Sequence, residues 1–449
     1  MILTMSSNLK KYFIITYGCQ MNLHESEKIA GILSSMGYQS TNNENDADVI
    51  VFNTCCIREN AEDRAEGNIG ALKKLKRTNK DLIIAVGGCM TQQKGQAEEL
   101  KSKFPFIDII FGTHNLEDFK SLFLQKISGK KKIIAVEEKE GPVKEGTPTT
   151  RTSFPNAWVN ITYGCNNFCT YCIVPYVRGR ERSRKMQDVI NECKQLIKDG
   201  YKEITLLGQN VNSYGNDIDD ENTNFANLIT EISKLDGNFR LRFMTNHPKD
   251  FNLPLIKAIS SSSKVCKSVH LPVQAGSNRI LKLMNRRYTR EDYLEKVKTL
   301  REYIPDIAIT TDIMVGFPTE TEEDFNDTVD LVNRVGFSGA FTFIYSRRSG
   351  TPAATMDGQI DEEVSKKRIM QLIDLQNSIN REQSKEYLNK TIEILCEGYD
   401  EKKGAYLGRD TYGRMAYFTS PVDIIGQFVS VKIIKTGGIS LIGEIVNDK

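Results

Sequence analysis

In the first quarter of the chain, segments with the hydrophobic pattern of a β-strand alternate with segments that have the pattern of an α-helix. Short apolar runs of strand length are separated by segments in which apolar residues recur every three or four positions, as on one face of a helix. In the helical segment 22–36, Asn22 and Glu25 have the spacing of a capping box, and Gly37 ends the pattern. The pattern predicts a small doubly wound parallel sheet. Its expected strands are 12–16, 49–53, 82–86 and 107–111, and its expected helices are 22–36 and 57–77.

A second α/β pattern follows a polar segment, 133–153, that is rich in Gly, Pro, Thr and Glu. Such composition is typical of a linker. The alternation beyond it predicts a parallel (β/α) barrel, or an open part of one, with active groups in the loops after the strands. The expected strands are 158–162, 204–207, 241–244, 268–271, 307–314 and 340–343, and the expected helices are 186–199, 225–235, 290–303 and 321–335.

The last part of the chain changes from helix to strand. A long helix is expected over 361–389, packed on the barrel, and five short strands are expected within 391–446. Five strands in about sixty residues predict a small closed β-barrel of the kind that binds RNA. In this segment tyrosines alternate with basic residues. Such a pattern is found both on nucleic-acid-binding faces and on ordinary solvated surfaces, and these residues do not favour one of the two interpretations. These cations are Lys402, Lys403, Arg409 and Arg414.

Composition adds the class of protein. The chain of 449 residues is long enough for several domains, with 39% hydrophobic and 26% charged residues and no run of membrane-spanning length. Its start lacks a signal-peptide core, so we expect a cytoplasmic protein, in which ten cysteines indicate metal binding or catalysis rather than disulfides. The net charge of +2 does not decide for or against nucleic acid. The expected domains are 9–135, a linker 136–153, 154–386 and 387–449.

Three cysteines directly follow the first strand of the second pattern. Cys165, Cys169 and Cys172 have the spacing C-x3-C-x2-C, which can bind one face of a four-iron cluster and leave one iron without a protein ligand. The alternative is structural zinc, which needs a closed set of four ligands. No fourth Cys or His lies near this loop, since the nearest histidine is His247. The spacing therefore favours the cluster.

Three other cysteines occupy matched positions in the first pattern. Cys19, Cys55 and Cys89 each follow an expected strand within a few residues. Parallel strands bring their carboxyl ends to one edge of a sheet, so these thiols should converge there as ligands of a second metal centre. The alternative is that they are buried structural thiols. For the neighbouring Cys56 we expect inward packing.

A basic run lies a few residues beyond the three-cysteine loop. Its arginines are Arg178, Arg180, Arg182 and Arg184. A charge run is usually a solvated face, but this one is at the rim of the expected site, where it could hold phosphate. We therefore expect these arginines to contact nucleic acid.

The motif C-x3-C-x-aromatic-C resembles the signature of the radical S-adenosylmethionine (SAM) enzymes. The resemblance implies that the open iron chelates SAM and that Tyr171 lies beside its adenine. It also implies that polar loops after later strands hold the rest of SAM. The residues concerned are Gln209, Gln274, Ser277, Val315 and Gly316.

Over the whole chain, the cysteine-bearing sheet, the radical SAM barrel and a terminal barrel similar to the TRAM domain resemble the radical SAM methylthiotransferases. The resemblance implies two [4Fe-4S] clusters, the auxiliary one on Cys19, Cys55 and Cys89. It is strongest with the branch that methylthiolates C2 of N6-isopentenyladenosine next to the anticodon of tRNA. One SAM would supply the methyl group and another the 5'-deoxyadenosyl radical.

This resemblance implies three partners: the tRNA anticodon stem-loop, a reducing electron donor such as flavodoxin or ferredoxin, and a sulfur donor; no membrane is implied. Two alternatives remain, a methylthiotransferase acting on threonylcarbamoyl-adenosine in tRNA and a zinc-stabilised RNA-binding protein without turnover. The chain departs from the family pattern at Thr319, where Gly is usual, at Ala275, where Ser is frequent, and at Cys56. Thr in place of Gly at position 319 leaves the local backbone conformation of residues 317–320 open.

Overall fold

The computed structural model describes residues 9–56, 59–138 and 141–446, which form two compact units. The described residues of the first unit lie within 1–152, 163–166 and 173–182, and those of the second unit lie within 153–162, 167–172 and 183–449. Cys165 therefore belongs to the first unit, whereas Cys169 and Cys172 belong to the second.

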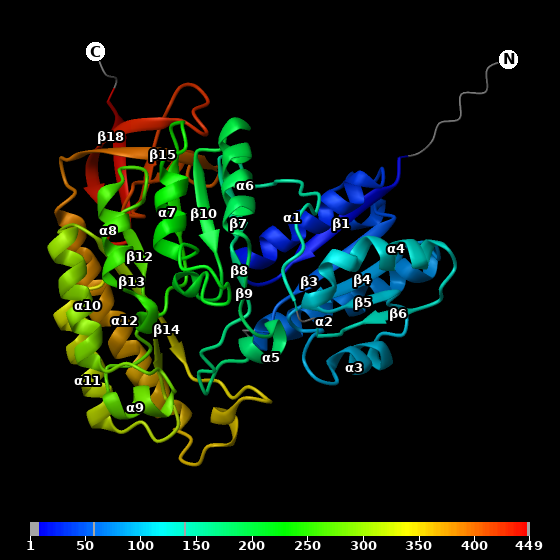
Figure 1. The fold of residues 1–449 in the computed structure, drawn as a ribbon, viewed down its shortest axis with the longest axis horizontal. Helices are drawn as coiled ribbons and strands as arrows, with labels where there is room; N and C mark the ends of the chain where they lie inside the picture. The colour runs from blue at the N-terminus through cyan, green and yellow to red at the C-terminus, as the bar shows by residue number, and fades with distance from the viewer. Residues whose placement is uncertain (1–8, 57–58, 139–140, 447–449) are drawn as a thin grey trace. The chain divides into compact units, whose positions relative to one another are not determined.

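The first unit is built on one parallel six-stranded sheet with the strand order β2-β1-β3-β4-β5-β6 (Figure 1). Helices cover both faces, as expected for a doubly wound sheet: α1 and α4 share one apolar cluster, and α2 and α3 share the other. The strands are β1 (Lys11–Thr16), β2 (Gln39–Ser40), β3 (Val49–Thr54), β4 (Ile83–Gly88), β5 (Ile109–Phe111) and β6 (Ile133–Ala135). The helices are α1 (Gln20–Ser35), α2 (Glu59–Thr78), α3 (Gln96–Lys103), α4 (Phe119–Ile127) and the short α5 (Val174–Arg178).

Two expectations for this unit were wrong. The polar segment 133–153 was expected to contain no strand, but it begins with β6, which extends the sheet by pairing with β5 and lies within the expected domain 9–135. The capping box was also wrong, because α1 begins at Gln20 with Cys19 as its N-cap and no side-chain cap. Asn22 lies inside the helix, where its amide donates to the carbonyl oxygens of Tyr17 and Thr54 at 2.7 and 2.9 Å. The Asn22 side chain, which the local pattern predicted to cap the helix, therefore forms tertiary hydrogen bonds instead.

The second unit contains the expected partial barrel. Two parallel three-stranded sheets, β7-β10-β11 and β12-β13-β14, are joined by a bridge between Leu241 and Val265. The strands are β7 (Asn156–Asn160), β10 (Glu203–Leu207), β11 (Arg240–Phe243), β12 (Ser268–His270), β13 (Ala308–Val315) and β14 (Gly339–Ile344). The helices are α6 (Met186–Lys198), α7 (Phe225–Ser233), α8 (Leu253–Ser261), α9 (Asn278–Leu283), α10 (Arg290–Tyr303) and α11 (Glu322–Val335). A two-stranded ribbon of β8 (Thr162–Tyr163) and β9 (Arg182–Ser183) adjoins this barrel in sequence.

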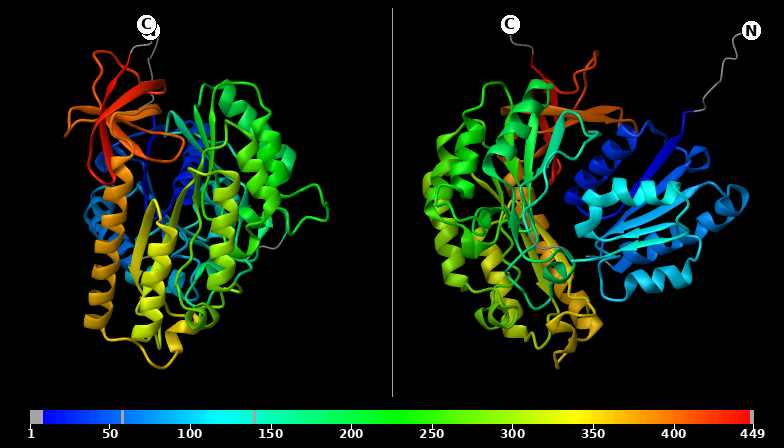
Figure 2. Two further views of the ribbon diagram at one scale, coloured as in Figure 1. Left: turned by 90° about the vertical axis from the view of Figure 1, so that its left-hand side faces the viewer. Right: turned by 45° about the vertical axis from the view of Figure 1, so that its right-hand side comes forward.

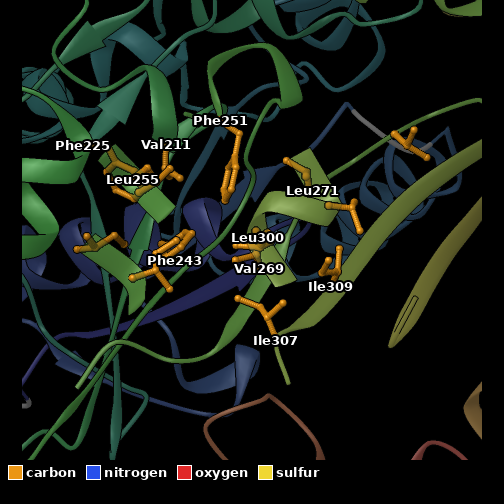
Figure 3. Packing of buried hydrophobic residues seen from close by; sticks show 14 of the residues in the cluster. Val211, Phe225, Phe243, Phe251, Leu255, Val269, Leu271, Leu300, Ile307 and Ile309 are labelled. Carbon is orange, nitrogen blue, oxygen red and sulfur yellow. The ribbon is translucent and has the colours of Figure 1, made fainter. Parts of the chain in front are cut away.

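The core of the second unit lies between the strands and their covering helices. Figure 3 shows strand residues such as Phe243 and Val269 packed with helix residues such as Leu255 and Leu300. All four side chains are at most 2% exposed. This continuous core holds the strand ends, and hence the loops after them, in fixed positions.

The long helix α12 (Glu362–Lys385) leads into the closed C-terminal barrel (Figure 2). Leu372 of this helix is buried in the core of the second unit, whereas Val364 at its start is 39% exposed. The barrel has the order β15-β16-β17-β19-β18. Its strands are β15 (Thr391–Asp400), β16 (Ala405–Arg409), β17 (Met415–Phe418), β18 (Phe428–Thr436) and β19 (Ser440–Ile445).

Two arginines of β11 attach the C-terminal barrel to the partial barrel. Arg240 donates to the Arg409 carbonyl oxygen at 2.6 Å and pairs with Glu393 at 2.9 Å. Arg242 forms a bidentate pair with the buried Glu203 and also donates to the Asp410 carbonyl oxygen at 3.3 Å. Charge-assisted contacts of this kind hold the two barrels of the second unit together.

Thr319 has a left-handed backbone, with φ of +67°. A β-branched residue in this region costs about 1–2 kcal/mol relative to glycine. The substitution Thr319→Gly should therefore raise the thermal unfolding midpoint, although it removes one hydrogen bond that Arg279 donates to the Thr319 hydroxyl at 3.1 Å. Thr321→Gly is the control: Thr321 has φ of −83° and caps α11, so this change should lower the midpoint. A lower midpoint for Thr319→Gly would contradict the prediction.

Candidate functional site

The first unit places three of the predicted cysteines at one edge of its sheet. Cys19 follows β1, Cys55 directly follows β3, and Cys89 directly follows β4. These three strands are parallel neighbours, so their carboxyl ends lie side by side. The topological prediction of a common edge is thus matched by the strand order. Their role as ligands stays a prediction.

Close backbone approaches shape this edge. At Gly18, with φ of +110°, a Cβ atom would stand 2.9 Å from the Cys55 sulfur, so a side chain there would displace the thiol. At Gly88, with φ of +102°, a Cβ atom would stand 2.3 Å from the Thr54 carbonyl oxygen. The Cys89 amide donates to that same oxygen at 3.0 Å. Glycine at both positions permits these close approaches between the loops that carry the thiols.

Cys55, Cys56 and Cys89 are buried and Cys19 is half-buried, and the guanidinium of Arg178 lies beside Cys89. Burial raises the pKa of Cys19, and Arg178 lowers it in part. A hydrogen bond from Cys56 lowers the pKa of Cys89 against the effect of burial, and Arg178 lowers it further. The Cys56 thiol, 1% exposed, has its pKa raised by its bond to Cys89. Cys56 therefore packs inward but also contacts the candidate ligand set, and the choice of Cys55 over Cys56 stays a prediction.

Arg178 lies inside this thiol cluster and not on the surface. It is 4% exposed, and its Nε donates to the Cys89 sulfur at 3.2 Å. Its other nitrogens bond to Glu25 at 2.6 and 3.2 Å and to the Asn22 side-chain oxygen at 2.8 Å. All the nitrogens are used, so the structure argues against the predicted contact between Arg178 and a phosphate. The charge of Arg178 predicted a surface contact, and nothing in the local sequence indicates these buried partners.

The three-cysteine loop begins in the first unit. The Cys165 amide donates to the Gly179 carbonyl oxygen at 3.2 Å, and the Glu181 amide donates to the Asn166 side chain at 3.2 Å. Gly164 has φ of +77°, and a Cβ atom there would stand 2.1 Å from the Arg180 carbonyl oxygen. A glycine is required for this tight return of the chain before Cys165.

The rest of the loop is held by the second unit. The Thr170 amide donates to the Met284 carbonyl oxygen at 3.1 Å, and Asn285 donates to the carbonyl oxygens of Asn167 and Phe168 at 3.2 and 2.9 Å. Arg286, 4% exposed, directs one nitrogen to the Cys169 sulfur at 3.4 Å. Neither Asn285 nor Arg286 was expected at this loop from the sequence. Their local signal is the polar run 285–287 directly after the amphipathic helix α9.

The residues predicted to hold SAM lie at the carboxyl ends of the barrel strands. Gln209 follows β10, Gln274 follows β12, Val315 ends β13, and Gly316 directly follows it. Ser277 has a structural use, because its hydroxyl caps α9 and bonds to Asp324 at 2.5 Å. The Gly316 amide donates to Glu320 at 2.8 Å. Tyr171 lies within the cysteine loop, where burial raises the pKa of its hydroxyl. These placements fit the predicted edge, and the contacts to SAM stay predictions.

The remaining basic residues that were predicted to bind RNA differ in their exposure and in the partners that they already have. Arg184 is 4% exposed and bonded to Glu192 and to the Asn160 carbonyl oxygen, which argues against a phosphate contact. Arg180 and Lys402 are exposed, and Arg182 is half-buried. Lys403 is exposed and lies 3.6 Å from the ring centre of Tyr417. Two other residues already have partners in the C-terminal barrel, Arg409 with Glu397 and Arg414 with the Gly438 carbonyl oxygen.

Three thiols are a donor set that fits an iron-sulfur cluster, and the first unit offers such a set at Cys19, Cys55 and Cys89, with the guanidinium of Arg178 beside one sulfur. In the second unit the guanidinium of Arg286 lies beside the Cys169 sulfur. Within the described ranges, no three His, Cys, Asp or Glu side chains stand close enough to hold a single metal ion. The same ranges contain no helix long and apolar enough to cross a membrane.

Three families match consecutive parts of the chain. Residues 11–112 match the uncharacterized protein family UPF0004, residues 159–332 match the radical SAM superfamily, and residues 385–446 match the TRAM domain. A tRNA-2-methylthio-N(6)-dimethylallyladenosine synthase from Clostridium beijerinckii is 51% identical over 443 residues, which cover 98% of this chain and 97% of the relative. One of the same name from Thermoanaerobacter pseudethanolicus is 52% identical over 436 residues, 97% of this chain and 92% of the relative.

Two solved structures share the fold at low sequence identity. The cobalamin-dependent SAM radical enzyme OxsB with aqua-cobalamin has a TM-score of 0.53 at 14% identity, covering 83% of this chain and 58% of that one. The radical SAM methyltransferase TsrM from Kitasatospora setae, with cobalamin and a [4Fe-4S] cluster bound, has a TM-score of 0.56 at 14% identity, covering 77% of each chain. These likenesses confirm the radical SAM fold.

Proposed function

This chain belongs to the family of the tRNA-2-methylthio-N(6)-dimethylallyladenosine synthases, and we propose that it methylthiolates C2 of N6-isopentenyladenosine next to the anticodon of tRNA. The observation that carries the proposal is that half of all positions are identical to these relatives over nearly the full length of both chains. The radical SAM match over residues 159–332 agrees with the proposed chemistry.

The two cysteine sets support a division into two sites. Cys165, Cys169 and Cys172 would hold the [4Fe-4S] cluster that binds SAM, and Cys19, Cys55 and Cys89 would hold an auxiliary [4Fe-4S] cluster. An aromatic C–H bond offers neither an acidic proton nor a leaving group, so side chains alone cannot activate it. When bound, the clusters and SAM would supply the radical chemistry, the sulfur and the methyl group. A reducing electron donor and a sulfur donor complete the proposal.

The chain's own residues hold and shield the reacting groups. Asn285 and Thr170 fix the backbone of the cysteine loop, and Gln209, Gln274 and Gly316 provide polar groups at the strand ends where SAM would bind. The target base must leave its stack to be reached, which favours a single-stranded anticodon loop as substrate.

For RNA binding we propose the exposed turn between β15 and β16, which carries Lys402 and Lys403. Removal of one lysine–phosphate ion pair should reduce the slope of log affinity against log salt by about 0.7–0.9. We therefore expect a smaller slope for Lys402→Gln and Lys403→Gln, measured by binding of an anticodon stem-loop at several salt concentrations. Lys432→Gln, an exposed change on β18 of the same barrel, serves as the control. Equal slopes for all variants would exclude this turn from the interface.

Mass spectrometry of tRNA nucleosides tests the proposed reaction. Deleting the gene should remove the 2-methylthio derivative of isopentenyladenosine and leave isopentenyladenosine itself to accumulate. Expression of the intact chain should restore the derivative. Loss of a methylthio derivative of threonylcarbamoyl-adenosine instead would assign the chain to the other tRNA-modifying branch.

A further inference from the structure

We propose that Arg178 is a positioning residue for the cluster at Cys19, Cys55 and Cys89, and that its hydrogen bond to the Cys89 sulfur raises the reduction potential of this cluster. The inference rests on the proposed function, because it takes these thiols as cluster ligands. It concerns a residue that the sequence pattern had assigned to RNA.

The guanidinium is held in one orientation by its partners. Glu25 accepts from two of its nitrogens at 2.6 and 3.2 Å, and the Asn22 side-chain oxygen accepts at 2.8 Å. Such a fork between arginine and a carboxylate fixes the plane of the guanidinium. The remaining Nε–H then points at the Cys89 sulfur, 3.2 Å away. Arg178 thus has a sulfur-directed donor whose position depends on Glu25 and Asn22.

The segment that carries Arg178 also forms an apolar wall of the thiol cluster. Arg178 is the last residue of α5, and Ile173 and Val177 from this segment pack with Cys56 and Cys89. All four side chains are at most 8% exposed. Water is therefore largely kept from the Cys89 sulfur, and the Nε–H bond acts where solvent screening is weak.

The expected sign follows from charge. Reduction adds negative charge to a cluster, and an N–H donor from a cation stabilises that added charge on the ligand sulfur. Hydrogen bonds to the sulfurs, net charge and solvent exposure are the main controls of cluster potential. Removing the Arg178 charge and its N–H bond should therefore lower the potential. An N–H donor from an arginine to a cysteine sulfur also occurs in the second unit, where Arg286 donates to the Cys169 sulfur at 3.4 Å.

The experiment uses the full chain with Cys165, Cys169 and Cys172 replaced by Ala, so that only the second cluster can bind. In this background Arg178→Gln, Arg178→Lys and Arg180→Gln are prepared anaerobically. Arg180→Gln is the matched control, since it removes the same charge from an exposed position two residues away. Iron and sulfide per chain are measured, and the midpoint potential is taken from a redox titration followed by electron paramagnetic resonance.

We expect the parent to hold about four irons. Arg178→Gln should keep these irons, but at a fixed potential its ratio of reduced to oxidised cluster should fall about tenfold. For one electron, this is a midpoint potential lower by about 59 mV. Arg178→Lys retains the charge without the planar fork, so its potential should fall between those of the parent and Arg178→Gln. Arg180→Gln should match the parent. Loss of iron from Arg178→Gln but not from Arg178→Lys would also support a positioning role.

Three outcomes would overturn the inference. The first is an unchanged potential in Arg178→Gln with iron retained. The second is loss of iron from both Arg178 variants together with loss of secondary structure by circular dichroism, which would show a role in folding only. The third is a parent without iron, which would also reject the proposed auxiliary cluster, so the two failures are distinguishable.

Discussion

Cys165→Ala should abolish reductive cleavage of SAM to 5'-deoxyadenosine. The three thiolates of the C-x3-C-x2-C loop are the ligands proposed for the SAM-binding cluster, and the loop offers no fourth cysteine to replace one of them. Without this thiolate the cluster should not form stably, so the cleavage rate should fall to that of iron-free protein. The measurement is chromatographic and mass-spectrometric detection of 5'-deoxyadenosine after anaerobic incubation with SAM and dithionite.

The matched control is Cys193→Ala. Cys193 is fully buried in α6 as part of the apolar core and lies outside both proposed cluster sites. Its truncation removes one buried atom, at a cost of about 1 kcal/mol, without touching a proposed ligand. The control should retain cleavage and its iron content. Cleavage at the parent rate in Cys165→Ala would reject the assignment of the loop.

Cys89→Ala should separate the two halves of the reaction. It removes a ligand proposed for the auxiliary cluster, so iron should fall from about eight to about four per chain, at four per cluster. The loop of Cys165, Cys169 and Cys172 is unchanged, so SAM cleavage should persist while the 2-methylthio nucleoside disappears. Anaerobic iron analysis, 5'-deoxyadenosine and tRNA nucleosides are measured on the same preparation. Equal loss of cleavage and methylthiolation would contradict the division between two sites.

Cys56→Ala is the control for this experiment. Cys56 is as buried as Cys89 and is hydrogen-bonded to it, but it is the thiol that we do not assign as a ligand. We expect this variant to keep about eight irons. If it instead lost half of its iron while Cys55→Ala did not, Cys56 would replace Cys55 in the ligand set.

Much of the fold follows from local patterns. The helix expected over 290–303 coincides with α10 (Arg290–Tyr303), and the expected barrel strands overlap the observed ones, because each repeats a short apolar run bounded by polar turns. Strand β6 was missed because three residues, Ile133–Ala135, are too few to show a period. They become a strand only because β5 offers an edge to pair with.

In the candidate site too, some features follow from local sequence and others depend on tertiary contacts. The cysteines could be located from sequence because their spacing, and their place after strands, are local properties that parallel topology carries to one edge. The basic run could not be resolved from sequence, because exposure depends on distant partners: Glu25 lies 153 residues from Arg178. The pattern therefore treated Arg178 and Arg180 alike, whereas the structure buries the first and exposes the second.

The sequence by itself determined the fold class, the order of the three matched domains and the six candidate cysteines, because periodicity and spacing are recorded along the chain. Tertiary structure decided which charged groups reach those cysteines. A guanidinium is stable away from water only when carboxylate, amide and sulfur acceptors from separate elements meet around it. Glu25, Asn22 and Cys89 meet in this way at Arg178, and no local pattern of residues 178–184 contains that information.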